Sequence, residues 1–294
     1  MEPIPTPTPV VDSPSAPRAT AIPPLPEAEL GDTQPLLDIR NVTVHLGFGS
    51  ARTRILDSVS LAVRRGHTLG LVGESGSGKS TLARTLVGEI SASSGEISFA
   101  GRDIRNPSRP QLRKLRRAVQ LIPQDPYSSL NPRRTIGQAL AEAIDPIHGT
   151  VRRHRADIGE WLERVALPAD AAERYPHEFS GGQRQRIAIA RALAVKPQLI
   201  IADEITSALD LTTQAEILNL LADLRRDVDM TMLFISHNLA VVRHVSDEVA
   251  VLFRGDLVEF GHADQVYNEP AHDYTRRLMA SVPGGLGFNI DVEN

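Results

Sequence analysis

Residues 71–82 of this 294-residue chain read LVGESGSGKSTL, the end of an apolar run followed by glycines, a lysine and hydroxyl side chains. The stretch satisfies the pattern G-x-x-x-x-G-K-[ST], with Gly73, Gly78, Lys79 and Ser80 at the fixed positions. Glycines let successive backbone N–H groups turn towards a phosphate, and the N-terminus of a following helix favours an anion. The stretch therefore predicts a nucleotide phosphate loop between a strand and a helix.

Each polar residue of the loop suits a part of a nucleotide. Lys79 brings positive charge to the β- and γ-phosphates, the Ser80 hydroxyl can coordinate Mg²⁺, and Thr81 can donate towards the α-phosphate. The residues expected to hold the nucleotide here are Gly73, Glu74, Ser75, Gly76, Ser77, Gly78, Lys79, Ser80 and Thr81. Many unrelated proteins share such a loop, so the loop alone does not say which reaction follows.

A pair of carboxylates indicates what happens to the phosphate. The run LIIADE at 199–204 predicts a buried strand that ends in Asp203 and Glu204. An aspartate at the tip of a parallel strand beside the phosphate loop can hold Mg²⁺. Glu204 can orient or deprotonate an attacking water, which favours hydrolysis over transfer to a substrate hydroxyl. Taken alone, such a pair is commonly a solvated strand end; the upstream loop favours the functional interpretation.

Strands alternate with helices along the rest of the chain. The apolar runs at 67–73 and 231–237 are typical of central parallel strands, and residues 183–195 and 213–227 have helical periodicity. This order predicts an α/β domain around a mostly parallel sheet.

Composition limits the other classes of function. The net charge of −4 gives no bulk basicity for nucleic acid, and the absence of cysteine excludes disulfides and iron–sulfur sites. No window reaches the roughly 18 apolar residues that span a bilayer, and the N-terminus lacks a secretion signal. We therefore expect a cytoplasmic protein. Ten of the 21 prolines fall in residues 1–35, which predicts a disordered tail, with a docking ligand for a proline-binding module as the minor alternative.

The segment HEFSGGQRQRIAIARAL at 177–193 lies between the two motifs. Its helix opens with Ser180, Gly181, Gly182 and Gln183, and small residues at a helix N-terminus suit an anion. By itself this start is equally consistent with an ordinary N-cap serine followed by flexible glycines. Together with the loop and LIIADE at this spacing, it resembles the signature of the ATP-binding cassette (ABC) family. The resemblance covers nearly all of residues 36–282.

The resemblance implies a fold and further site residues. The implied fold is a P-loop NTPase cassette over 36–265, with a RecA-like core, an antiparallel β subdomain and a helical subdomain at about 126–184. It implies that Glu204, His237 and Gln124 are catalytic, His237 contacting the γ-phosphate and Gln124 linking the metal and water to a membrane partner. Asp210 matches the D-loop and is expected at the nucleotide. The implied Mg²⁺ ligands are Ser80, Gln124 and Asp203.

Finer details resemble the oligopeptide/dipeptide importer group. They are QDPYSSLNPRRTIGQAL at 124–140 and VYNEPAHDYTRRLMASVP at 266–283, which make 266–294 a short C-terminal extension. The implied activity is ATP hydrolysis that energises import of peptides or similar small polar solutes, with ATP and Mg²⁺ bound.

The resemblance also implies partners. A second cassette completes the two sites, with a heterodimer favoured and a homodimer as the alternative. Two membrane permease subunits are expected near Gln124 and residues 125–140, and an extracytoplasmic solute-binding protein acts indirectly. The chain would lie peripherally on the cytoplasmic face of the membrane, with no nucleic acid partner.

Two positions depart from the family pattern. Leu46 aligns where the family stacks an aromatic ring on adenine, and His45 or Phe48 would have to substitute. Ile205 follows Glu204 where the family has proline. We expect Leu46 to affect affinity and base selectivity, and Ile205 to have a modest effect on coupling while hydrolysis is retained.

Three alternatives remain open. The first is the ATPase of an exporter, although exporters commonly fuse membrane helices to the cassette. The second is a regulatory cassette without turnover, against which the retained Glu204 and His237 argue. The third is a cassette that acts on nucleic acid; residues 85–176 show no heptad run, and the basic residues of 113–117 are expected on a solvated helix face.

Overall fold

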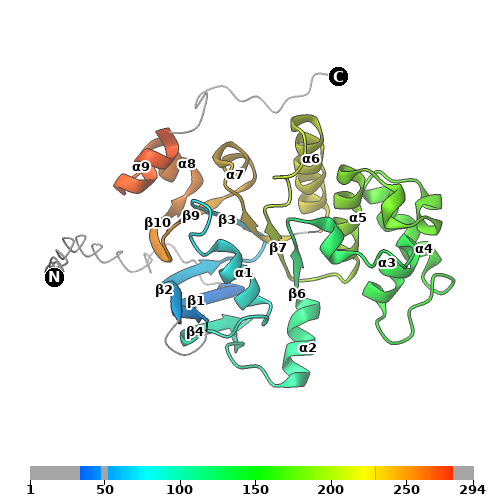
Figure 1. Ribbon diagram of the computed structural model, residues 1–294, viewed down its shortest axis with the longest axis horizontal. Helices are drawn as coiled ribbons and strands as arrows, with labels where there is room; N and C mark the ends of the chain where they lie inside the picture. The colour runs from blue at the N-terminus through cyan, green and yellow to red at the C-terminus, as the bar shows by residue number, and fades with distance from the viewer. Residues whose placement is uncertain (1–33, 48–51, 229, 281–294) are drawn as a thin grey trace, which may run out of the picture.

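The computed structural model describes residues 34–47, 52–228 and 230–280 (Figure 1). Most of the predicted N-terminal tail, Phe48 and the last part of the predicted C-terminal extension lie outside these residues. Within them, no helix is both long and apolar enough to cross a membrane.

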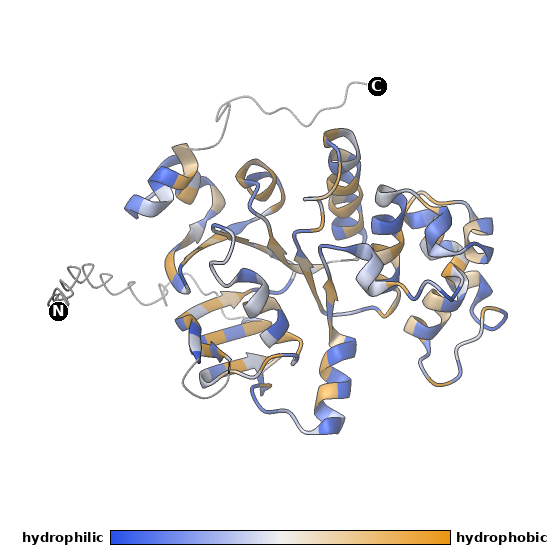
Figure 2. Ribbon diagram, in the orientation of Figure 1, coloured by the Kyte–Doolittle hydropathy of each residue, from blue (hydrophilic) through white to orange (hydrophobic). Residues whose placement is uncertain are grey.

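A six-stranded sheet forms the centre of the molecule, in the order β10-β9-β3-β8-β7-β6. Strands β9, β3, β8, β7 and β6 run parallel to one another, and β10 pairs antiparallel with β9. Their bounds are β3 Thr68–Val72, β6 Val119–Ile122, β7 Leu199–Asp203, β8 Thr231–Ile235, β9 Glu248–Phe253 and β10 Asp256–His262. Every residue of β3, β7 and β8 is buried, as expected for parallel strands covered on both faces. Figure 2 shows these strands as a hydrophobic centre.

A second, four-stranded sheet is antiparallel along its whole order β2-β1-β4-β5. Its strands are β1 Leu37–Leu46, β2 Thr53–Val63, β4 Ser94–Phe99 and β5 Arg102–Asp103. It packs with helix α1 (Lys79–Leu86) against one face of the central sheet, where alternate residues such as Leu69, Leu71 and Leu233 join one core.

Helices cover the other face of the central sheet. The opposite residues of the same strands, including Ile200, Met232 and Phe234, belong to a second core. This core also contains residues of α3 (Ile136–Ile144), α4 (Arg155–Arg164), α5 (Gly181–Ala194), α6 (Leu211–Val228) and α7 (Leu239–Val245). Figure 1 shows α3, α4 and α5 together at one end of the molecule, beyond β6 and β7.

Helix α1, which follows the phosphate loop, has only eight residues. It ends at Leu86, and Gly88 then adopts φ 71°, a left-handed conformation that stops a helix. Helix α2 (Arg109–Ala118) carries the basic stretch, with Leu115 buried and the basic residues from Arg113 to Arg117 exposed, as expected of a solvated face.

The C-terminal part adds two helices that the sequence patterns left unassigned. They are α8 (Ala263–Asn268) and α9 (Asp273–Ala280), which follow β10. Figure 1 shows both at the end of the molecule opposite to α3 and α4.

Candidate functional site

The phosphate loop leaves β3 and enters α1 in a conformation that requires glycine. Gly73 has φ 153°, and a Cβ there would lie 2.1 Å from the backbone oxygen of Leu252. Gly78, the N-cap of α1, has φ 107°. No other residue type fits these two positions without strain. The predicted strand–loop–helix arrangement is therefore present.

The side chain of Lys79 folds back into this loop. Its ammonium group donates hydrogen bonds to the carbonyl oxygens of Gly73 (2.8 Å) and Glu74 (2.9 Å). Only 4% of the residue is exposed. Burial lowers the pKa of Lys79, and the nearby carboxylates of Glu204 and Asp203 oppose that change. The loop thus holds a desolvated positive charge.

Ser80 and Asp203 connect the phosphate loop to the end of β7. The Ser80 hydroxyl donates to Oδ1 of Asp203 over 3.1 Å. Asp203 is 8% exposed, and burial raises the pKa of its carboxyl group. The serine and aspartate predicted as metal ligands are therefore neighbours in space, although 123 positions separate them.

Glu204 follows directly and approaches two other predicted residues. Its Oε1 lies 3.9 Å from Nζ of Lys79 and 3.5 Å from Nδ1 of His237. The backbone of Glu204 has φ 51°, which is left-handed and uncommon for a residue with a side chain. Because the loops after β3, β7 and β8 meet here, the site lies at the carboxyl ends of parallel strands, where α/β sheets bind ligands.

Gln124 joins this cluster through one intermediate residue. Its Nε2 donates to Oγ of Ser207 (3.0 Å), and that hydroxyl donates to the backbone oxygen of Glu204 (2.9 Å). This linking role of Ser207 was not identified from the sequence. The available signal was its place three residues after Glu204, a spacing at which a serine hydroxyl can cap a turn.

The signature residues begin helix α5 in a capping box. The Ser180 hydroxyl accepts from the N–H of Gln183 (3.3 Å), and the Gln183 side chain accepts from the N–H of Ser180 (3.0 Å). Gly182 packs so closely on α6 that a Cβ would lie 2.3 Å from Thr213. The interpretation of Ser180 as an N-cap thus describes its state in this chain.

Asp210 lies beside the signature, at the start of α6. It accepts hydrogen bonds from the backbone N–H (3.0 Å) and the hydroxyl (2.8 Å) of Thr213, and the backbone bond is the main reason that its pKa is lowered. Figure 1 shows α5 and α1 well apart, on either side of β6 and β7. Within the described residues, no hydrogen bond or ion pair joins the signature to the phosphate loop.

The two departures from the family pattern have different settings. Leu46 is 38% exposed at the end of β1, next to His45, whose Nδ1 lies 3.2 Å from Oγ of Ser93. A side chain there offers apolar contact to a base without an aromatic face. Ile205 is 2% exposed and belongs to the second core, so it contributes packing.

The donor atoms present fit a metal ion that arrives with a nucleotide. Among the described residues, no group of three or more His, Cys, Asp or Glu side chains could hold a metal alone. The Ser80 hydroxyl and the Asp203 carboxylate supply oxygen ligands, and Mg²⁺ usually combines few protein oxygens with water and phosphate oxygens.

Comparison with protein families matches residues 56–207 to the family described as ABC transporter. A Brucella ovis protein with a provisional name as a peptide import ATP-binding protein is 47% identical over 250 residues, which cover 85% of this chain and 79% of the relative. The chain belongs to the ABC transporter family. It is therefore an ABC cassette, an ATP-binding and ATP-hydrolysing protein, as the signature and phosphate loop predicted.

Solved ABC proteins have the same fold as this cassette. CbiO1 from Clostridium perfringens, part of the transporter complex cbiONQ, matches with a TM-score of 0.71 and 26% identity, over 85% of this chain and 97% of that chain. The ATP-binding cassette MJ0796, a dimer in a post-hydrolysis state with ADP and phosphate, matches with a TM-score of 0.67 and 30% identity, over 77% and 98%. The predicted α/β cassette fold is thereby confirmed.

Proposed function

We propose that this cassette hydrolyses ATP to energise the import of peptides or similar small polar solutes. The observation that carries the hydrolytic part is the cluster of Lys79, Glu204 and His237, in which the Lys79 ammonium nitrogen (3.9 Å) and a His237 ring nitrogen (3.5 Å) lie close to one carboxylate oxygen of Glu204. The importing part rests on relatives such as the Brucella ovis protein and on the importer-like segment at 124–140.

The first step is capture of the ATP phosphates by the loop at 73–81. Lys79 would exchange the carbonyl oxygens of Gly73 and Glu74 for β- and γ-phosphate oxygens, a stronger, charge-assisted contact. Among the described residues, the buried Ser77 hydroxyl has no hydrogen-bond partner, so it is available as a further donor. The loop thus supports recognition of a nucleoside triphosphate.

Residues Ser80, Asp203 and Gln124 would hold Mg²⁺ when ATP is bound. The bound ion would neutralise charge on the β- and γ-phosphate oxygens. The bound cation would favour the ionised form of the Asp203 carboxyl group, which burial disfavours.

Glu204 is the group proposed to act on water. Its carboxylate would orient the water and accept its proton as the water oxygen bonds to the γ-phosphorus and the bond to ADP breaks. His237 would contact the departing phosphoryl group, where the imidazole can donate a hydrogen bond. The backbone of Glu204 is fixed by its N–H bond to the oxygen of Ile235 (2.9 Å), which directs the side chain towards the loop.

A second cassette is proposed to complete each site. Among the described residues, no hydrogen bond or ion pair joins the signature to this chain's own phosphate loop, which supports a contact elsewhere. Ser180, Gly181, Gly182, Gln183 and Asp210 would close over ATP bound to a partner cassette. A helix N-terminus with small residues is suited to that anion. We favour a different cassette as the partner, with a second copy of this chain as the alternative.

The same proposal gives the remaining partners. Two membrane permease subunits would dock near Gln124 and residues 125–140, so that contact at the membrane reaches Glu204 through Ser207. A solute-binding protein outside the membrane would select the substrate, and the cassette would lie peripherally at the cytoplasmic face.

The test is ATP hydrolysis by the complex that co-purifies with the tagged full-length chain, reconstituted in lipid. Wild-type activity should rise when peptide-loaded binding protein is added, and Glu204→Gln should reduce kcat at least about 100-fold while ATP binding persists, because the base is lost. Glu89→Gln, at an exposed glutamate after α1, is the matched control and should retain activity. Unchanged hydrolysis in Glu204→Gln would exclude the role given to this residue.

A further inference from the structure

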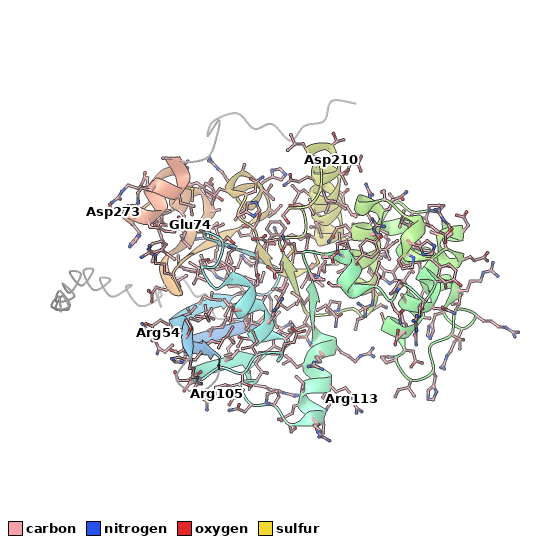
Figure 3. The ribbon with its side chains drawn as sticks, viewed as in Figure 1. Arg54, Glu74, Arg105, Arg113, Asp210 and Asp273 are labelled. Atoms are coloured by element: carbon pink, nitrogen blue, oxygen red, sulfur yellow. The ribbon has the colours of Figure 1, made fainter. Side chains whose placement is uncertain are left out.

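Helix α9 reaches the phosphate loop from the C-terminal part of the chain. The hydroxyl oxygen of Tyr274 accepts a hydrogen bond from the backbone N–H of Glu74 over 3.1 Å. Tyr274 is 3% exposed, and its ring lies against Phe253 at the end of β9, with ring centroids 4.0 Å apart. In Figure 3, Glu74 and Asp273, the first residue of α9, lie on the same side of the molecule.

This contact acts on the same peptide group as Lys79. The N–H of Glu74 and the C=O of Gly73 belong to one planar trans peptide, so they point in opposite directions. The carbonyl accepts from the Lys79 ammonium over 2.8 Å, while the N–H donates to Tyr274. The two side chains therefore fix the orientation of this peptide from both sides.

The position of Tyr274 is itself well determined. Glu259 on β10 accepts hydrogen bonds from the N–H groups of Ala271 (2.8 Å) and His272 (3.0 Å), and His272 Nδ1 accepts from the N–H of Tyr274 (3.1 Å). The preceding helix α8 is held to the first residue of α7, because the Tyr267 hydroxyl donates to the oxygen of Leu239 over 2.5 Å. Helix α9 is therefore a fixed support for the loop.

We infer that Tyr274 is a positioning residue for nucleotide binding, a role that rests on the proposed function of the phosphate loop. The N–H of Glu74 donates to the Tyr274 hydroxyl on the side of the peptide opposite to Lys79. By holding the first peptide of the loop, the Tyr274 hydroxyl keeps the loop ready for phosphates before the nucleotide arrives. Preorganisation of this kind strengthens binding because less ordering remains to be done.

The first test is calorimetric titration of the full-length chain with Mg-ADP. Tyr274→Phe keeps the ring on Phe253 and removes only the hydroxyl, and affinity should fall about 3- to 10-fold, as for loss of one hydrogen bond. Thr275→Val is the matched control at the next residue of α9, because its hydroxyl is fully buried and has no hydrogen-bond partner in the part of the chain that the structure describes. The control should bind Mg-ADP as the wild type does.

Two further readouts separate positioning from a merely structural role. Tyr274→Ala should lower Tm, and Tyr274→Phe should restore Tm without restoring affinity. In the lipid-reconstituted complex, Tyr274→Phe should raise KM for ATP and leave kcat nearly unchanged, because the contact serves bound ground and transition states alike.

Wild-type affinity in Tyr274→Phe, or an equal loss in Thr275→Val, would overturn the inference. Hydrogen exchange at the Glu74 amide of the unliganded wild-type chain gives a check that needs no variant: slow exchange is expected, and unprotected exchange would also overturn it. Lys79→Ala distinguishes the two proposals. Only the inference about Tyr274 fails if the wild type binds Mg-ADP, Lys79→Ala does not bind it, and Tyr274→Phe binds it with wild-type affinity. If the wild type itself does not bind Mg-ADP, both the proposed function and the inference fail.

Discussion

Lys79 and Asp203 carry opposite charges in a setting that water hardly reaches. They are 4% and 8% exposed, and burial lowers the pKa of Lys79 and raises that of Asp203. Each ionised form is thus disfavoured by desolvation in the nucleotide-free chain. Functional sites commonly keep such groups at a cost in stability, because the ligand later supplies the missing partner.

This setting predicts that Asp203→Asn stabilises the nucleotide-free chain while hydrolysis is lost. Removing a buried negative charge should add about 0.5–2 kcal/mol to the free energy of unfolding at pH 7, the range common for single stabilising substitutions. Since the folded pKa of Asp203 is raised above its ordinary value of 3.8, the cost in stability begins as the pH rises past 3.8 and is complete above the raised pKa. The difference between variant and wild type should therefore shrink as the pH falls towards 3.8.

Urea unfolding at pH 4 and pH 7 measures this difference. The control is Asp264→Asn, whose side chain is 88% exposed and whose stability should match the wild type at both pH values. A less stable Asp203→Asn chain at pH 7 would refute the assignment of Asp203 as a desolvated charge.

Ile205 gives a second prediction at this scale. It is 2% exposed and follows Glu204, whose φ of 51° is disfavoured before a proline. Ile205→Pro should therefore cost about 2–4 kcal/mol, because it removes buried volume and displaces the glutamate backbone, whereas Ile205→Val should cost about 0.5–1.5 kcal/mol.

Thermal unfolding and ATPase rates measured on the same two variants check this. The proline variant should lose hydrolysis more than the valine variant does. A proline variant that is both stable and more active than the wild type would mean that isoleucine impairs this turn.

At the scale of elements, helices α5 and α3 both begin with a capping box made by a hydroxyl side chain and a glutamine. Ser180 and Gln183 open α5, and Thr135 and Gln138 open α3. Because the local bonds are alike, their contributions to helix stability should be alike. Only the start of α5 carries the signature that is proposed to contact a nucleotide.

Ser180→Ala and Thr135→Ala therefore form a matched pair. Each should lower the free energy of unfolding by about 1 kcal/mol, the usual cost of a lost N-cap. In the reconstituted complex, Ser180→Ala should reduce the ATPase rate well below that of Thr135→Ala. Equal rates at equal stability would show that Ser180 serves only as a helix cap.

Much of the element order could be predicted from sequence, since apolar runs such as 199–203 are long enough to mark buried strands. Local patterns also predicted the phosphate loop and the two carboxylates at the end of β7. Contacts between distant positions were beyond such patterns: the Tyr274–Glu74 bond joins residues 200 positions apart. The left-handed backbone of Glu204 was missed because its cause is the tertiary bond to Ile235, not a local turn residue.

At the scale of the whole molecule, the phosphate loop and the signature lie in different parts of the folded chain. The loop is held between the two sheets and α9, whereas the signature begins α5, beside α3 and α4 (Figure 1). This separation is the basis for proposing that one cassette supplies halves of two sites. Closure against a partner would then bring Ser180 of one cassette to the ATP held by Lys79 of the other.

The most direct measurement is the ATPase rate per wild-type chain across a range of protein concentrations, with the molecular mass followed by sedimentation in the same samples. Repeating the series with the co-purified second cassette covers a heterodimer. We predict a negligible rate where the chain is monomeric and a rate that rises in proportion to the paired fraction. A full rate that stays constant per chain in samples that are entirely monomeric would contradict the composite site.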